Sequence, residues 1–396
     1  MKRAAPSSSD NYFGIEMPED LSFAEDPEFW KLPINQQMSK FPANWSASDR
    51  YRGILVLSGA KSKYQRACEA FEEMAEASSS AQGPPAQGPD QATQPPDLPE
   101  RPAPTEGFTL QAANPAPRDG DLYMIEETHT YYCKGEKVRL SATGIAKKYF
   151  PCFDGAAIVE KNYNNWKDDK SGKYKMMIDY LKKIEGKDDA YCKEAIVKTW
   201  SANGSAASED GTDMHRDFQY IVEGLPPPQG NTDEVTQFRQ WIHDFCTTYQ
   251  LKPWRAEWNI YYEGPDGRCV LAGQVDLVLK HVAKDEYWCV DYKRKDPQRK
   301  FKNGPQVILG EEKQSKFTEM GTGPLASIPS TDFGKYTVQQ NIYGHIAAQQ
   351  YGIDFRDRMY LLQVHPSLDK PHLVGVERLD DEMEEVFRLE IEAMSS

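Results

Sequence analysis

The sequence lacks the features that mark secreted and membrane proteins. It has no CxxC pair, and its seven cysteines are an odd number, so we expect free thiols in a reducing compartment instead of a disulfide framework. No apolar run approaches the roughly 18 residues of a membrane span. The N-terminus is acidic and has no apolar signal-peptide core. These absences predict an intracellular protein of the nucleus or cytoplasm that is not secreted and has no membrane partner.

An excess of positive charge is also missing. The chain has 61 Asp and Glu against 47 Lys and Arg, a formal net charge of −14. We therefore do not expect a protein that coats nucleic acid over its whole surface. A local basic groove is still compatible with this charge, because salt screens acidic groups beyond about 8 Å at physiological ionic strength.

A segment poor in apolar residues divides the chain. Residues 77–118 are dominated by Pro, Gln, Gly and Ser and cannot bury enough apolar surface to offset their ordering entropy, which predicts a disordered linker. Residues 1–76 are loop-rich and acidic, with one expected helix at 62–77. We interpret this disordered N-terminal region as an accessory segment that binds a protein partner, and a dispensable tail is the alternative. Residues 119–396 are expected to form the main domain.

The main domain has the pattern of an α/β fold. We expect a short mixed sheet that contains an antiparallel meander and is flanked by helices beginning at Gly211 and Tyr336. The expected elements are two strands within 121–141, helices at 142–150, about 161–201, 211–224 and 236–249, the meander strands 255–262, 269–281 and 287–293, a helix at 336–351, a strand at 358–365 and a closing helix.

The meander brings two aspartates and a lysine onto one face of the sheet. With the second turn near residues 283–285, residues whose numbers sum to about 567–569 face each other. Asp276 therefore lies opposite the stretch from Asp291 to Lys293. Because side chains alternate along a strand, Asp291 and Lys293 point the same way. Tyr292 points to the other face and leaves its carbonyl available as a further oxygen ligand.

These charged groups stand among apolar neighbours such as Val275 and Val290. A buried carboxylate is costly unless it is paired or bound to metal, and two facing aspartates repel each other unless a cation lies between them. Such oxygen ligands suit Mg²⁺ or Mn²⁺. The metal would polarise a phosphate oxygen and activate water, with Lys293 orienting the nucleophile or offsetting charge. The alternative for an isolated D-x-K pair is a surface hairpin with solvated ion pairs.

Several motifs around this hairpin occur in a specific order. GTDMH contains His215, RAEWN contains Glu257, GQVD contains Gly273 and Asp276, VDYK contains Asp291 and Lys293, and QQNIY contains Gln339 and Tyr343. In this order the chain resembles the PD-(D/E)XK nuclease superfamily, in particular its RecB-type and lambda-exonuclease-like branches. The resemblance covers about Gly211 to Tyr343. The proline of the family's name is absent, and no four-cysteine set suggests an iron–sulfur cluster.

The resemblance implies a restriction-endonuclease-like core and hydrolysis of phosphodiester bonds. DNA is favoured over RNA by the resemblance alone. The resemblance implies an exonuclease that acts on DNA ends or single strands in DNA repair or recombination. A structure-specific endonuclease, a catalytically silent nucleic-acid-binding module and a hydrolase of other phosphate esters are the alternatives. The implied metal ligands are His215, Glu257, Asp276 and Asp291, and the implied catalytic residues are Asp276, Asp291 and Lys293, with Gln339 and Tyr343 positioning the substrate or the lysine.

A basic stretch directly follows the hairpin and predicts phosphate contacts. A solvated loop is the alternative. A second contact is predicted at residues 147–150, where Tyr149 and Phe150 would stack on unpaired bases. The basic residues after the hairpin are Arg294, Lys295, Arg299, Lys300 and Lys302.

Overall fold

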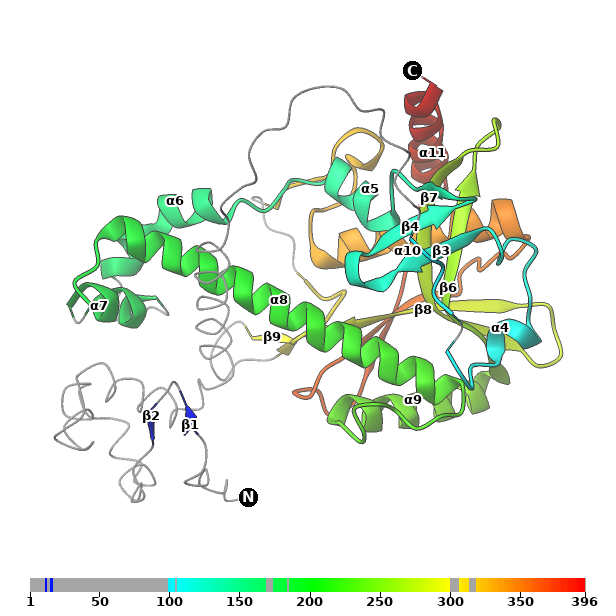
Figure 1. Ribbon diagram of the computed structural model, residues 1–396, viewed down its shortest axis with the longest axis horizontal. Coiled ribbons are helices and arrows are strands. Elements are labelled where there is room, and N and C mark those ends of the chain that lie inside the picture. The colour runs from blue at the N-terminus through cyan, green and yellow to red at the C-terminus, as the bar shows by residue number, and fades with distance from the viewer. Residues whose placement is uncertain are drawn as a thin grey trace. The chain divides into compact units, whose positions relative to one another are not determined.

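A computed structural model describes residues 11–12, 15–16, 99–103, 105–168, 174–183, 185–299, 306–312 and 318–395 (Figure 1). The predicted helix at 62–77 and most of the predicted linker lie outside the described residues. The described chain divides into two compact units, one with Phe153–Ser208 and one with residues 99–152 and 209–395. Within the described ranges, no helix has both the length and the apolar character needed to cross a membrane.

The unit with Phe153–Ser208 is helical in this segment and has its own core. It holds α6 (Gly155–Asp168), α7 (Lys175–Lys183) and the first part of α8 (Asp189–Val222). The sequence predicted one helical stretch here, and Gly186, at φ 68°, separates α7 from α8. Side chains from all three helices that are at most 1% exposed pack together, namely Val159, Tyr163, Ile178, Cys192 and Ile196.

The other unit is built on a five-stranded mixed sheet with the strand order β12-β11-β8-β7-β6 (Figure 1). Strands β6 (Leu251–Glu263), β7 (Cys269–His281) and β8 (Tyr287–Arg294) form the predicted antiparallel meander. Strand β11 (Met359–Val364) pairs in parallel with β8, and β12 (His372–Gly375), which was not predicted, pairs antiparallel with β11. The predicted α/β fold with a mixed sheet and helices is therefore confirmed.

Helices cover both faces of this sheet. Successive side chains of β8 point to opposite faces of the sheet: Cys289 belongs to the apolar cluster on one face, and Val290 and Tyr292 belong to the cluster on the other. The cluster of Cys289 includes side chains of α10 (Asp332–Tyr351). The cluster of Val290 includes side chains of α8 and α9 (Asp233–Tyr249).

Shorter elements complete the described chain. Strands β3 (Leu122–Ile125), β4 (Thr130–Cys133) and β5 (Glu136–Lys137) form a three-stranded antiparallel sheet. The remaining elements are α4 (Leu110–Ala113), α5 (Ala142–Tyr149), α11 (Asp380–Ser395), the 3-10 helices η3 (Glu126–Thr128) and η4 (Gly323–Leu325), and the strand pairs β1 (Asn11–Tyr12) with β2 (Ile15–Glu16) and β9 (Gln298–Arg299) with β10 (Gln306–Val307).

Helix α8 shows that the predicted helix start at Gly211 was wrong. The helix is continuous from Asp189 to Val222. A glycine inside a helix costs only about 1 kcal/mol relative to alanine, which the rest of a long helix outweighs. No packing among the described residues requires the glycine, since a Cβ at Gly211 would meet none of their atoms within 4 Å. His215 therefore projects from the interior of a long helix and not from its first turn.

Residues 105–118 are structured, although the predicted linker was expected to extend to residue 118. Helix α4 is followed by Asn114, whose Nδ2 donates to the Trp254 carbonyl at 3.0 Å. The guanidinium of Arg255 donates to the Asn114 carbonyl and pairs with Asp119, both through Nη1. These hydrogen bonds tie the segment to β6. Composition alone does not reveal them, because the partners lie more than 100 residues away in the sequence.

Glu390 of α11 is a buried carboxylate that joins this helix to α5. It accepts hydrogen bonds from Lys148 Nζ at 2.6 Å and from the Tyr149 hydroxyl at 2.9 Å. Glu390→Gln keeps the shape but removes the charge, so we expect the free energy of unfolding to fall by about 1–2 kcal/mol. Urea unfolding followed by tryptophan fluorescence measures the change. Glu385→Gln, in an exposed pair with Arg388, is the control with little expected effect, and an equal loss in both variants would contradict the prediction.

Candidate metal centre

Three carboxylates lie in one row across adjacent strands of the sheet. On β6 and β7 the residues flanking Glu257 pair with those flanking Asp276, which places the two acidic residues beside each other. On β7 and β8 Leu277 pairs with Val290, so their numbers sum to 567 and Asp276 comes beside Asp291. This register confirms the predicted hairpin arithmetic.

The backbone ladder is interrupted at this row. Glu257 has φ 44°, in the left-handed region that a glutamate rarely adopts, and it makes no ladder pair with Asp276. The pairing of β7 with β8 stops at Leu277, and the Tyr292 amide donates to Asp276 Oδ2 at 2.6 Å instead. A backbone held in such a region costs about 1–3 kcal/mol, and such strain concentrates at functional sites. The fold therefore holds these carboxylates together against local backbone preference.

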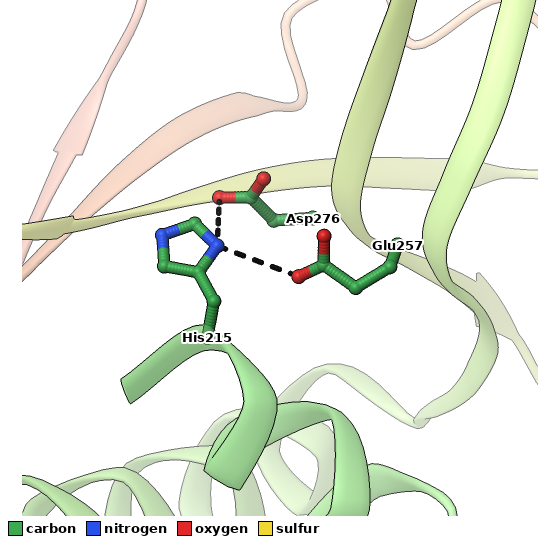
Figure 2. A group of neighbouring side chains, drawn as sticks. All are labelled: His215, Glu257 and Asp276. Carbon is green, nitrogen blue, oxygen red and sulfur yellow. Dashed lines mark ion pairs between the residues drawn. The ribbon is translucent and has the colours of Figure 1, made fainter. Parts of the chain in front are cut away.

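His215 of α8 points at two of these carboxylates (Figure 2). Its Nδ1 lies 3.4 Å from Glu257 Oε1 and 3.6 Å from Asp276 Oδ2. One possible ligand atom from each of the three residues lies within 4.8 Å of the others. His215 Nε2 is 3.3 Å from the carbonyl oxygen of Tyr292. The structure thus brings together three of the predicted ligands and the predicted carbonyl.

Asp291 is the most enclosed member of the row, at 1% exposure. Its carboxylate forms an ion pair with Lys293, but neither of its oxygens accepts a well-directed hydrogen bond from the described residues. The same holds for Glu257 Oε1. A buried acceptor without a partner is costly, so Asp291 Oδ1 is an available ligand atom for a cation; Asp291 Oδ2 and Glu257 Oε1 already lie beside the cationic side chains Lys293 and His215.

Two cationic side chains balance the row. Burial opposes a charged imidazole, but the Asp276 and Glu257 carboxylates outweigh it and raise the pKa of His215 to about 9. Burial likewise opposes a charged ammonium, but Asp291 and Asp276 outweigh it and raise the pKa of Lys293. Burial and then Asp276 raise the pKa of Asp291 to about 6. The raised pKa of Asp291 shows that the two cationic side chains do not fully offset burial and the negative charge of the carboxylates.

Helix α10 holds the lysine. Lys293 Nζ donates to Gln339 Oε1 at 3.2 Å, and Gln339 Nε2 donates to the Tyr343 hydroxyl at 2.8 Å. The buried Tyr343 ring lies against Gly273, where a Cβ would come 2.5 Å from Tyr343 Cε1. The close approach explains the glycine of the GQVD motif. Of the two roles predicted for Gln339 and Tyr343, the contacts favour positioning of the lysine.

Gly273→Ala places a methyl group where the Tyr343 ring now lies. Since Gly273 and Tyr343 are both buried, we expect the free energy of unfolding to fall by about 1–3 kcal/mol, as measured by urea denaturation. Gly120→Ala is the matched control, because a Cβ there meets no atom of the described part of the chain within 4 Å. Equal stability of Gly273→Ala and the wild type would contradict the close contact.

Two tyrosines near the carboxylates were not predicted. Burial, with the Glu257 and Asp276 carboxylates, raises the pKa of Tyr131 on β4 well above its usual range. The ring of Tyr336 on α10 has its centroid 4.7 Å from Lys293 Nζ. The helical spacing of Tyr336 from the QQNIY motif was a usable signal, whereas Tyr131 comes from a separate sheet and had none.

The described part of the predicted basic stretch is paired with acidic residues. Arg294 pairs with Asp210 at 3.1 Å and with Glu234 at 2.9 Å, and Lys295 pairs with Asp332. Contact with phosphate would require these residues to exchange partners, and it stays a prediction. The Arg299 side chain, Lys300 and Lys302 lie outside the described residues.

The predicted stacking of Tyr149 and Phe150 on unpaired bases is wrong. Tyr149 and Phe150 are 7% and 4% exposed and belong to the core of the sheet unit. Their aromatic character serves packing, so neither ring presents a face on which a base can stack.

No protein-family model matches the chain, and no curated protein matches it. The assignment of a function therefore depends on the arrangement of the side chains and on the order of the motifs.

Proposed function

We propose that this chain is a metal-dependent nuclease of the PD-(D/E)XK superfamily that uses Mg²⁺ or Mn²⁺ and acts on DNA. The observation that carries the proposal is the row of Glu257, Asp276 and Asp291 on adjacent strands, with His215 and Lys293 beside it. The mixed sheet, in which β8 bears the aspartate and the lysine and pairs in parallel with β11, supports a restriction-endonuclease-like core.

The residues present fit a hard divalent cation. The carboxylates are crowded, and Asp291 Oδ1 has no hydrogen-bond partner among the described residues, while Asp291 Oδ2 pairs with Lys293 and Glu257 Oε1 lies 3.4 Å from His215 Nδ1. Carboxylate and carbonyl oxygens suit Mg²⁺ or Mn²⁺. His215, Asp276, Asp291 and the Tyr292 carbonyl would hold the metal, with Glu257 completing the set.

A cation bound there would polarise a phosphate oxygen and lower the pKa of a water molecule. The chain's own contribution is the ammonium group of Lys293, which Asp291 and Gln339 hold. Because its pKa is raised, Lys293 stays protonated at neutral pH. As a protonated donor it would orient the attacking water or stabilise charge on the phosphate.

The nature of the substrate rests on the resemblance together with the basic residues after β8. Arg294 and Lys295 follow Lys293 directly in the sequence and pair with acidic residues of α8, α9 and α10, and a polyanion bound at the row would exchange with these partners. We propose DNA hydrolysis from ends or on single strands, as the RecB-type and lambda-exonuclease-like motifs imply.

The test is hydrolysis of end-labelled single- and double-stranded DNA and RNA by the purified full chain with Mg²⁺, Mn²⁺ or EDTA. We expect DNA cleavage with metal and none with EDTA. Asp276→Asn, purified in parallel, excludes a contaminating nuclease. Closed circular DNA separates exonuclease from endonuclease action, since only an endonuclease opens it. If the wild type binds DNA but cleaves no substrate with either metal, a silent binding module replaces the nuclease.

A further inference from the structure

The ammonium group of Lys293 has three different partners. Asp291 pairs with it by charge, Gln339 Oε1 accepts its hydrogen bond at 3.2 Å, and the ring of Tyr336 lies with its centroid 4.7 Å from Nζ. The Lys293 side chain is only 14% exposed. A cation over an aromatic ring is attracted to it, and more strongly where water is excluded.

One face of α10 supplies two of these partners. Tyr336, Gln339 and Tyr343 follow each other at spacings of three and four residues, so they share a helix face. The N-cap lies five residues before Tyr336 and fixes the start of this helix, where the Thr331 hydroxyl accepts from the Gly334 amide at 3.0 Å. The ring is therefore held on an anchored helix and not on a free loop.

With metal bound in the proposed active state, the three partners would restrain Lys293 to different degrees. Asp291 would share its charge with the metal, which weakens its attraction for the lysine. Gln339 is a single neutral acceptor on a flexible side chain. It therefore restrains Lys293 only weakly, because a lysine has a long stem with many rotamers. The Tyr336 ring is rigid, and its attraction for the ammonium does not depend on the metal ligands.

We infer that Tyr336 is a positioning residue for Lys293, whose ring keeps the ammonium in place while Asp291 binds the metal. The inference rests on the proposed function. The ring, and not the hydroxyl, makes the contact, so phenylalanine should replace tyrosine here and leucine should not.

The contact itself is tested without any activity. In protein labelled with ¹³Cε-lysine, the Lys293 resonance is assigned by its loss in Lys293→Arg. We expect this resonance to carry a ring-current shift in the wild type and in Tyr336→Phe, and to lose it in Tyr336→Leu. An unchanged Lys293 resonance in Tyr336→Leu overturns the inference.

The consequence is tested by kinetics. We expect kcat in Tyr336→Leu to fall about tenfold, as the loss of a desolvated cation–π contact implies, with KM changed less than about twofold and with wild-type calorimetric Mn²⁺ binding. Tyr336→Phe should keep wild-type kcat. So should the matched control Phe333→Leu, which removes a ring from the first turn of the same helix.

Wild-type kcat in Tyr336→Leu, or an equal loss in Tyr336→Phe, overturns the inference and leaves the proposed function standing. If the wild type hydrolyses no substrate, the proposed function fails, and the resonance of Lys293 alone decides whether the ring holds the lysine.

Discussion

Lys293→Met is expected to lower kcat for DNA hydrolysis by about 10²–10³-fold, the usual loss when one preorganised donor to a developing charge is removed. Methionine keeps a stem of similar length but has no ammonium group. Since Lys293 donates and does not hold the metal, calorimetry should show Mn²⁺ binding retained in the variant. Lys293→Arg should recover part of the loss, because it restores the charge with a different donor geometry.

Lys295→Met is the matched control, two residues further along the chain. Among the described residues, Lys295 pairs with Asp332 and not with the carboxylate row. Since its predicted role is phosphate contact, its loss should act on binding and on the salt dependence of KM and not on kcat. Wild-type kcat in Lys293→Met would show that the active site is assigned wrongly, and lost metal binding would make Lys293 a structural residue instead of a donor.

Asp291→Asn is expected to have opposite effects on stability with and without metal. Folding raises the pKa of Asp291 to about 6 through burial and then Asp276, from about 3.9 for a free aspartate. The folded state therefore binds the proton more tightly, and wild-type stability falls as the pH rises from about 4 to 6. In EDTA at neutral pH, Asp291→Asn should be more stable by about 1–3 kcal/mol, a gain of a few degrees in Tm.

This gain should shrink as the pH falls through 6 towards 4, where the wild-type carboxyl is also neutral. Mg²⁺ or Mn²⁺ should raise the Tm of the wild type by mass action but not that of the variant, which should also be inactive. Asp285→Asn, at the tip of the same hairpin, is the control, because the neighbouring Lys280 holds the pKa of Asp285 below its usual range. Thermal unfolding at several pH values, with metal and with EDTA, measures the Tm of each protein. An Asp291→Asn variant less stable than the wild type in EDTA at neutral pH would contradict the prediction.

The sequence by itself determined the hairpin that carries Asp276, Asp291 and Lys293. Strand alternation is strict and the turn between β7 and β8 is short, so residue numbers alone set which side chains face each other. The pairing of Leu277 with Val290 follows that arithmetic. The helix with Gln339 and Tyr343 was also predicted, because helical periodicity is a local property.

Only the tertiary structure decided what surrounds that hairpin. The contact of Lys293 with the ring of Tyr336 and the acidic partners of Arg294 both come from segments distant in the sequence. The unbroken α8 that carries His215 runs through Gly211, where the sequence alone predicted a helix start. Local patterns fix periodicity and register within an element or a hairpin, whereas the packing of elements against each other decides which charges meet, and the proposed metal site is made by that packing.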